Sequence, residues 1–347
     1  MIVYWIACLA SVLIAWRGMQ TISGRKNKWI VCALAGFPLF LVAALRFDVG
    51  SDYMSYREYY EGVLHPFHAD YWNIEPLFYW LNVALAKINA DPQWIFVVSA
   101  MIFAAGVFSQ IFEDSPYPGL SIFLLMFMGY YFGFFNVMRQ MIGCGILLYS
   151  LRYVQKRQAL RFFICVAVAS GFHVSCALFV FVYWVARIRI RPLMALILSV
   201  GLFAMQYLVG WILTDLVSWT RYSIYITSIY ADGKTAYVML AINAVLLIFA
   251  YAFGRDDPRY RMYSNLQLIN LWVIMLSGRV VLILRLMWMF GLPSVILVPM
   301  ALSNIKDTKK RRILMILITV LYFIYSYYTV GIMNSNQVLP YKTIFSR

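Results

Sequence analysis

Long apolar runs follow one another along almost the whole chain, and this feature leaves few folds open to it. Hydrophobic residues make up 63% of the 347 residues, and charged residues make up only 12%. Soluble domains carry about a quarter of their residues as charged side chains. A run of about 20 apolar residues crosses a bilayer as a helix, because the backbone must then satisfy its own hydrogen bonds. We therefore predict an all-α, polytopic helical bundle in which residues 1–347 form a single integral membrane domain.

The apolar runs predict about 10 to 12 transmembrane segments. Two segments do not fit a simple crossing. Residues 76–88 are too short to span and should form an interfacial or re-entrant helix. Residues 161–186 have basic loops at both ends and a polar break at 170–175, so we expect a re-entrant hairpin that places His173 inside the protein, with two short crossings as the alternative. The regular spans are expected at 1–16, 29–45, 94–112, 119–135, 137–154, 192–210, 236–253, 266–284, 286–303 and 313–331.

The basic residues indicate which side of the membrane each loop occupies. Short loops that are rich in lysine and arginine face the cytoplasm. Most of the 29 basic residues lie in loops 17–28, 152–161, 187–191, 255–261 and 306–312. The net charge of +15 therefore reflects topology, and no nucleic-acid partner is expected. The large loop 46–93 should then lie on the opposite side, and it holds half of the 14 acidic residues of the chain.

Arginines in or near the outer half of the membrane are the strongest indication of a binding site. An arginine at this depth is costly, so it normally faces a cavity and pairs with another group. Guanidinium groups bind phosphate oxygens through two parallel hydrogen bonds, and a cluster of them suits a pyrophosphate. Internal salt bridges with Asp48, Asp52, Glu58 or Glu75 are the alternative for any single arginine. The six arginines are Arg46, Arg57, Arg139, Arg221, Arg279 and Arg285.

Other polar and aromatic residues suit a carbohydrate. Tyr53 and Tyr56 follow Asp52 at helical spacing, and aromatic rings next to acids are typical of sugar sites, although an interfacial aromatic belt is the alternative. Gln140 could donate to sugar hydroxyls or bond another helix. His173 is either a satisfied core residue or a catalytic one.

Several motifs together resemble one known family. They are R-F-x-V-G-S-D-Y-x-x-Y from Arg46 to Tyr56, Glu75-Pro76, Asn136 with Arg139-Gln140, Phe172-His173-Val174-Ser175, and Leu339-Pro340-Tyr341-Lys342. In this order and spacing they resemble the EpsG-like branch of the Wzy-type polysaccharide polymerases over nearly the whole chain. The resemblance implies a multi-pass enzyme of the bacterial inner membrane whose active site faces the periplasm. Such enzymes join lipid-linked oligosaccharide repeat units in the biosynthesis of O-antigen or a related surface polysaccharide.

In the implied reaction, the growing glycan leaves undecaprenyl pyrophosphate for the non-reducing end of another lipid-linked unit. The reaction needs cations for the leaving group and one base for the acceptor hydroxyl. We assign the pyrophosphates to Arg46, Arg139, Arg279 and Arg285, with Arg221 as a further candidate. The base candidates are Asp52, Glu75 and His173, with Asp52 preferred because it follows Arg46 within one short loop. The sugar contacts are assigned to Gln140, Tyr53 and Tyr56.

No nucleotide-sugar motif and no metal-ligand pattern occurs in the sequence, so neither a cofactor nor a metal is expected. The expected partners are the undecaprenyl-pyrophosphate-linked oligosaccharide and membrane lipid, with a chain-length regulator protein as a further candidate. Three other functions remain open, because buried arginines or a buried histidine also suit them. They are a flippase or exporter of the lipid-linked oligosaccharide, an O-antigen ligase, and a membrane O-acyltransferase.

Overall fold

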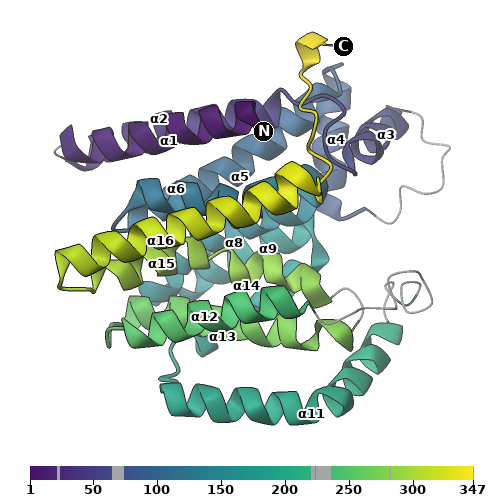
Figure 1. The fold of residues 1–347 in the computed structure, drawn as a ribbon. Coiled ribbons are helices and arrows are strands. Elements are labelled where there is room, and N and C mark those ends of the chain that lie inside the picture. The colour runs from purple at the N-terminus through teal and green to yellow at the C-terminus, as the bar shows by residue number, and fades with distance from the viewer. Residues whose placement is uncertain (22–23, 65–73, 220–222, 224–235, 281–282, 347) are drawn as a thin grey trace. The chain divides into compact units, whose positions relative to one another are not determined.

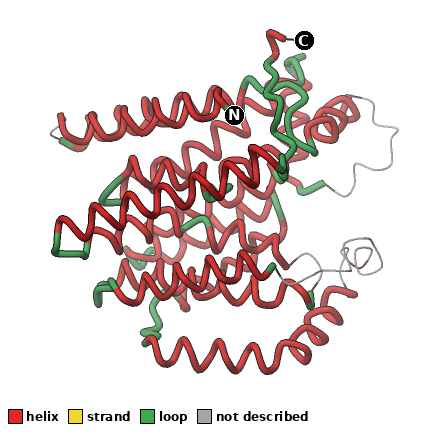
Figure 2. The backbone as a smooth tube through the Cα atoms, in the orientation of Figure 1, coloured by secondary structure: helices red, strands yellow, loops and turns green. Residues whose placement is uncertain are grey.

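The computed structural model describes the chain outside residues 22–23, 65–73, 220–222, 224–235, 281–282 and 347 (Figure 1). Within the described residues the regular structure is helical and no strand forms (Figure 2). The prediction of an all-α polytopic helical protein is confirmed. The chain divides into two compact units: unit 1 comprises residues 1–180 and 305–347, and unit 2 comprises residues 181–304. That the chain acts as one membrane domain stays a prediction.

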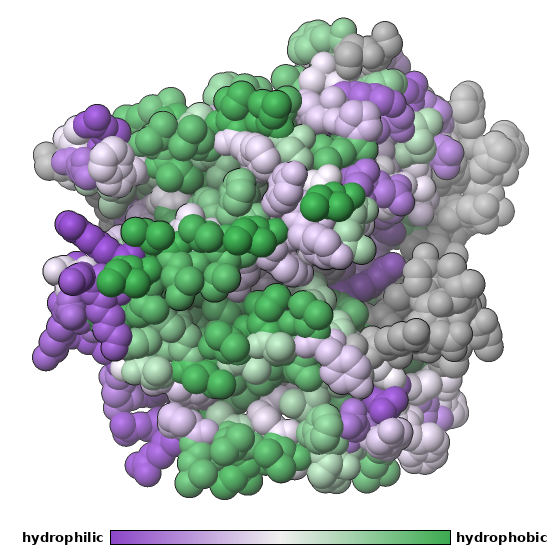
Figure 3. All heavy atoms as spheres, in the orientation of Figure 1, coloured by the Kyte–Doolittle hydropathy of each residue, from purple (hydrophilic) through white to green (hydrophobic). Residues whose placement is uncertain are grey.

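Unit 1 contains most of the helices. They are α1 (Ile2–Thr21), α2 (Arg25–Ala44), α3 (Tyr53–Leu64), α4 (Pro76–Lys87), α5 (Gln93–Asp114), α6 (Pro118–Phe127), α7 (Tyr130–Asn136), α8 (Met138–Gln155), α9 (Ala159–Phe172) and α16 (Thr308–Ser326). Helices α1, α2, α5, α8 and α9 form a series in which each packs against the next. Figure 3 shows apolar surface along α16, with hydrophilic surface at its N-terminal end. Such a surface suits a helix that faces lipid.

Unit 2 is also helical. It contains α10 (Val182–Val185), α11 (Pro192–Ser218), α12 (Tyr237–Ala252), α13 (Pro258–Met275), α14 (Met287–Gly291) and α15 (Ser294–Ser303). A small core joins Ala195 of α11, Leu247 of α12, and Leu268 and Leu271 of α13. Side-chain amides join α12 to α13 as well, since the buried Asn270 donates from Nδ2 to Oδ1 of the half-buried Asn243 at 2.8 Å. Hydrogen bonds of this kind hold helices together where the hydrophobic effect between them is weak.

Among the described residues, five helical segments are long and apolar enough to cross a membrane, or seven if each of two bent pairs counts as one span. The five are Ile2–Thr21, Asn27–Ala44, Gln93–Asp114, Pro192–Ser218 and Thr308–Ile332. Helix α8 does not meet this criterion, although a span was predicted at 137–154. It carries Arg139, Gln140 and Arg152 but is largely buried between α5 and α9, so it has little need of an apolar surface. The predicted total of about 10 to 12 crossings stays a prediction.

Some predicted boundaries agree with the helices and others do not, since the span predicted at 192–210 continues to Ser218. Helix α4 begins at Pro76 as expected. The break predicted at 170–175 falls at His173. This residue has an extended backbone, with φ −157° and ψ 120°, and it separates α9 from a 3-10 helix, Val174–Phe181. The span predicted at 266–284 is wrong, because α13 runs from Pro258 to Met275. Asp257 starts this helix by accepting a hydrogen bond from the Tyr260 backbone N–H at 3.1 Å.

The segment after α2 is held by the C-terminal residues of the chain. Arg46 pairs with Thr343 in an isolated β-bridge, the Phe47 N–H donates to the Lys342 carbonyl at 3.0 Å, and the Gly50 N–H donates to the Gln337 carbonyl at 2.9 Å. We call residues 45–51 together with 336–344 the clasp. Asn136, the last residue of α7, accepts from the Ser51 N–H at 2.9 Å and donates to the Asn336 carbonyl at 3.0 Å. The clasp therefore fixes the point from which α8 begins.

Gly50 allows the clasp to approach α7, and we expect its replacement to be strongly destabilising. Its φ is +96°, and a Cβ at this position would lie 2.5 Å from the Phe135 carbonyl oxygen. Gly50→Ala should lower the free energy of unfolding by about 2 kcal/mol or more, measured by denaturation in detergent. Gly129→Ala is the matched control, because Gly129 has φ +92° but open space where its Cβ would lie. If both variants lose the same stability, the close approach at Gly50 is unimportant.

Candidate active site

The start of α8 brings together residues from two distant segments of unit 1. Arg139 Nη1 donates to Glu75 Oε2 at 2.6 Å. Glu75 stands directly before Pro76, at the N-cap of α4, and only 4% of its side chain is exposed, against 23% for Arg139. Of the salt bridges that the sequence left open for this arginine, the one with Glu75 is the one that forms.

Two aromatic rings surround this ion pair. The Arg139 Cζ atom lies 5.6 Å from the centre of the Tyr59 ring and 5.9 Å from that of Phe78. Rings at this distance attract a guanidinium group electrostatically and limit its motion. Tyr59 was not among the predicted site residues. Tyr59 follows Tyr56 by three residues and lies on the same face of α3, and this spacing could have indicated Tyr59 as a site residue.

His173, directly after α9, is linked to the start of α8 through Ser175. Its Nδ1 is 2.8 Å from Ser175 Oγ, and Gln140 Nε2, from the residue next to Arg139, donates to the same oxygen at 3.3 Å. The side chains of His173 and Gln140 are buried. Ser175 was part of a recognised motif, but the sequence analysis gave it no role. We call Glu75, Arg139, Gln140, His173 and Ser175 the α8 cluster.

Two glycines allow the helices around the cluster to lie close together. A Cβ on Gly171, near the end of α9, would lie 2.6 Å from the side chain of Leu77 in α4. A Cβ on Gly143, in α8, would lie 2.5 Å from Cys176 Sγ. Larger residues at either position would separate α4, α8 and the segment that carries His173.

Asp52 lies near the cluster but makes no ion pair with a described residue. Its side chain is half-buried and accepts from Ser51 Oγ at 2.8 Å. Its carbonyl accepts the first hydrogen bond of α3, from the Tyr56 N–H at 3.1 Å. Tyr56 in turn donates its hydroxyl to the Asn136 carbonyl at 3.0 Å. The carbonyl contact needs no particular side chain, so it does not account for the carboxylate of Asp52, whose catalytic role stays a prediction.

Arg46 is completely buried and bonded to backbone. Its Nη1 donates to the Phe135 carbonyl at 2.6 Å and to the Val49 carbonyl at 3.2 Å, and its Cζ lies 4.7 Å from the centre of the Phe135 ring. Burial lowers the pKa of the Arg46 guanidinium to about 10, so the group remains charged at neutral pH. With no exposed surface to offer a phosphate, Arg46 is placed to join the clasp to α7. Its predicted pyrophosphate role remains untested.

The predicted sugar contacts Tyr53 and Tyr56 are buried as well. Tyr53 stacks on Phe96 with ring centres 4.4 Å apart, and its hydroxyl donates to Gln93 Oε1 at 3.3 Å. Tyr56 packs against Phe78 in addition to its bond with Asn136. These contacts account for both rings, and sugar binding by either stays a prediction.

The remaining predicted arginines do not belong to unit 1, except Arg57. Arg57 forms an ion pair with Glu61 at 2.8 Å within α3, and Glu61 was not among the partners considered for it from sequence. Arg279 in unit 2 is exposed and lies 4.0 Å from the ring centre of Tyr207 in α11, and Arg285 is half-buried in a 3-10 turn of the same unit. Arg221 lies outside the described residues. That these three arginines join Arg139 around one ligand stays a prediction.

The fold and the α8 cluster define a polytopic helical membrane protein with a compact, largely buried polar site. The family model described as EpsG family matches residues 29–343. The chain belongs to the EpsG family, as its motifs had indicated. No match was found among the curated proteins or among the solved structures. Membership supports a general role as a membrane glycan polymerase.

Proposed function

We propose that the chain is a polysaccharide polymerase of the bacterial inner membrane. It transfers a growing glycan from undecaprenyl pyrophosphate to the non-reducing end of another lipid-linked repeat unit on the periplasmic face, in the biosynthesis of O-antigen or a related surface polysaccharide. The main support for this proposal is that this chain, a member of the EpsG family, contains the α8 cluster. It combines a partly exposed arginine at the start of α8 with a buried histidine at the end of α9, which shares the partner Ser175 with Gln140.

Arg139 is proposed to bind the departing pyrophosphate. A guanidinium group has five N–H donors, and Glu75 accepts from Nη1 alone in the ion pair described above. The remaining Nη donors suit phosphate oxygens, although Nε is buried, and the partial exposure of Arg139 gives a ligand access that Arg46 does not have. The N-terminus of α8 has no side-chain cap, so its dipole also favours an anion at this position. Glu75 then acts as the positioning residue for Arg139.

His173 is proposed as the general base. The contact with Ser175 orients the imidazole ring; in the tautomer whose Nδ1–H donates to Ser175 Oγ, Nε2 takes the proton from the acceptor hydroxyl. The hydroxyl oxygen forms the new bond to the anomeric carbon while the bond from that carbon to pyrophosphate breaks. The pyrophosphate leaves as an anion, which Arg139 stabilises. Asp52, preferred from sequence, remains an alternative base.

The reaction is proposed to need no metal or cofactor. Within the described part of the chain, no three histidine, cysteine, aspartate or glutamate side chains are grouped so that they could hold a metal ion. The direct experiment supplies purified protein with a lipid-linked repeat unit and follows the products on a gel. We expect a ladder of polymers with or without EDTA. Strong inhibition by EDTA that Mg²⁺ reverses would contradict the proposed chemistry.

The glycan of a strain that lacks this chain distinguishes the alternative functions. Single repeat units attached to the lipid core would indicate a polymerase. Loss of all surface glycan would indicate a flippase or a ligase, and an unchanged ladder would indicate an enzyme that modifies the glycan. The first result is the one we expect.

The proposed orientation predicts which residues a membrane-impermeant label can reach. In a variant without native cysteines, single cysteines at Arg187 and Lys309 should react only from the cytoplasmic side, because both lie in the basic loops. A cysteine at Glu61, an exposed residue of α3, should react only from the periplasmic side. Asp70, in the same predicted loop, lies outside the described residues. Reaction of position 61 from the cytoplasm would reverse the proposed orientation.

A further inference from the structure

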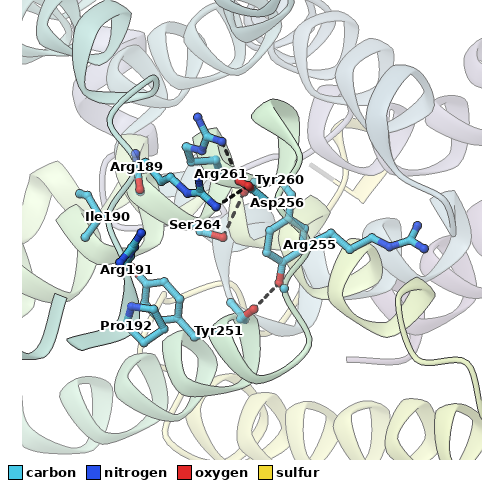
Figure 4. A pocket seen from close by; sticks show the side chains of 13 residues that line it. Arg189, Ile190, Arg191, Pro192, Tyr251, Arg255, Asp256, Tyr260, Arg261 and Ser264 are labelled. Atoms are coloured by element: carbon cyan, nitrogen blue, oxygen red, sulfur yellow. Dashed lines mark hydrogen bonds and ion pairs between the residues drawn. The ribbon is translucent and has the colours of Figure 1, made fainter. Parts of the chain in front are cut away.

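A second polar site lies in unit 2, within a pocket of about 220 Å³ (Figure 4). This is several times the roughly 30 Å³ that a water molecule occupies in the liquid. Four segments line it: residues 189–192 at the start of α11, Ala250 and Tyr251 at the end of α12, the turn 254–256 between α12 and α13, and the first turns of α13. The α8 cluster contributes nothing to the pocket, so the proposed polymerase reaction does not account for it.

Hydrogen bonds fix the walls of the pocket. Tyr260 Oη donates to the Ala250 carbonyl at 2.6 Å, which joins α13 to the end of α12. Asn265 Nδ2 donates to the Val185 and Ile188 carbonyls at 2.8 and 2.9 Å, which joins α13 to the chain that leads into α11. These hydrogen bonds therefore hold the segments that line the pocket in fixed positions within unit 2.

Four arginines and one aspartate line this space. Arg189 and Arg261 both point toward Asp256, at 2.5 and 2.8 Å, while the side chain of Arg255 extends away (Figure 4). The hydrogen bond from Arg261 lowers the pKa of Asp256, so the carboxylate stays charged but offsets only one of the four positive charges. Arg191 makes no ion pair with any described residue. The pocket therefore has excess positive charge that no described group neutralises.

Two further groups in the pocket lack a partner. The Tyr251 hydroxyl is buried and makes no hydrogen bond with a described residue, although buried tyrosine hydroxyls usually have a partner. The 27-residue helix α11 begins at Pro192, beside Arg191, and has no side-chain cap, so the positive end of its dipole lies at the pocket. Short basic loops explain cytoplasmic arginines, but they do not explain a buried, unsatisfied hydroxyl among them.

We propose that this pocket binds a phosphate group, carried by the headgroup of an anionic phospholipid or by a soluble phosphate compound. Arg191 and the start of α11 supply donors for its oxygens, and the Tyr251 hydroxyl adds a third once the side chains that enclose it move aside for the ligand. The first turns of α11 expose the apolar side chains of Leu193 and Ile197 beside the pocket, which suits the acyl chains of a lipid. Basic pockets at helix ends on the cytoplasmic side commonly bind lipid headgroups.

The test measures ligand binding to the full-length protein after lipid is removed in an uncharged detergent. The probes are short-chain phosphatidylglycerol, phosphatidylcholine with the same chains, and inorganic phosphate, and the readout is the shift in melting temperature with ligand concentration. We expect phosphatidylglycerol to bind more tightly than phosphatidylcholine. Arg191→Gln and Tyr251→Phe should each weaken this binding about fivefold.

Matched controls separate the pocket from general charge and packing effects. Arg312→Gln removes the same charge from α16, and Tyr207→Phe removes an exposed hydroxyl from α11, and neither residue lines the pocket. Both should bind phosphatidylglycerol like the wild type. Binding of phosphatidylglycerol alone identifies a lipid site, whereas inorganic phosphate binding that Arg191→Gln and Tyr251→Phe weaken identifies a soluble ligand.

Three results would overturn the proposal: no binding of either anionic probe, equal binding of the two lipids, or pocket variants that bind like the controls. If Arg191→Gln lowers the melting temperature without ligand, Tyr251→Phe decides alone, because it removes a single oxygen atom and keeps the ring.

Discussion

His173→Gln should lower the rate of polymer formation by about 100-fold or more, if His173 takes the proton from the acceptor hydroxyl. Glutamine keeps a polar group that can still bond Ser175, but it cannot accept a proton at neutral pH. The measurement is the initial rate at which purified protein extends a lipid-linked repeat unit, taken over a range of pH. The fall in rate at low pH that a histidine base produces should also disappear in the variant.

Two comparisons distinguish His173 from the other base candidates. Asp52→Asn should retain most activity, because Asp52 has no contact with Arg139 or His173 among those described above. Glu75→Gln removes the partner of Arg139 and should reduce activity without changing the pH dependence that His173 sets. An inactive Asp52→Asn together with a nearly active His173→Gln would instead make Asp52 the base.

Arg139→Lys should also reduce polymer formation by about 100-fold, while the protein still accumulates in the membrane. Lysine keeps the charge and can still pair with Glu75, but it loses the planar fork that binds two phosphate oxygens at once. Because the pyrophosphate gains charge as it leaves, the loss should fall mainly on kcat rather than on KM. The loss of activity is measured both as polymer yield in membranes and as the reaction rate of the purified protein.

Arg57→Lys is the matched control for this substitution. Arg57 also pairs with a glutamate, at 2.8 Å, but it lies within α3, and its ion pair with Glu61 is more exposed. Its replacement should leave the rate close to that of the wild type. Full-length polymer at the wild-type level from Arg139→Lys would remove Arg139 from the proposed pyrophosphate site.

Only part of the site could be predicted from sequence. The pattern Asn136 with Arg139-Gln140 indicated a polar site at the start of a helix, and α8 does begin at Met138. The sequence alone did not show which arginine is buried in the folded protein. Arg46 and Arg139 both follow apolar runs, yet one is completely buried and bonded to carbonyl oxygens and the other is partly exposed beside Glu75.

The sequence by itself determined the class of protein, because apolar runs in a bilayer must form helices to satisfy their own backbone groups. It also determined local breaks, such as the start of α4 at Pro76 and the end of α9 before His173. Only the tertiary structure decided which groups meet. Glu75 and Arg139 are 64 residues apart, and the clasp joins the segment after α2 to the C-terminal residues. Contacts over such separations depend on how whole helices pack, which no local spacing of residues specifies.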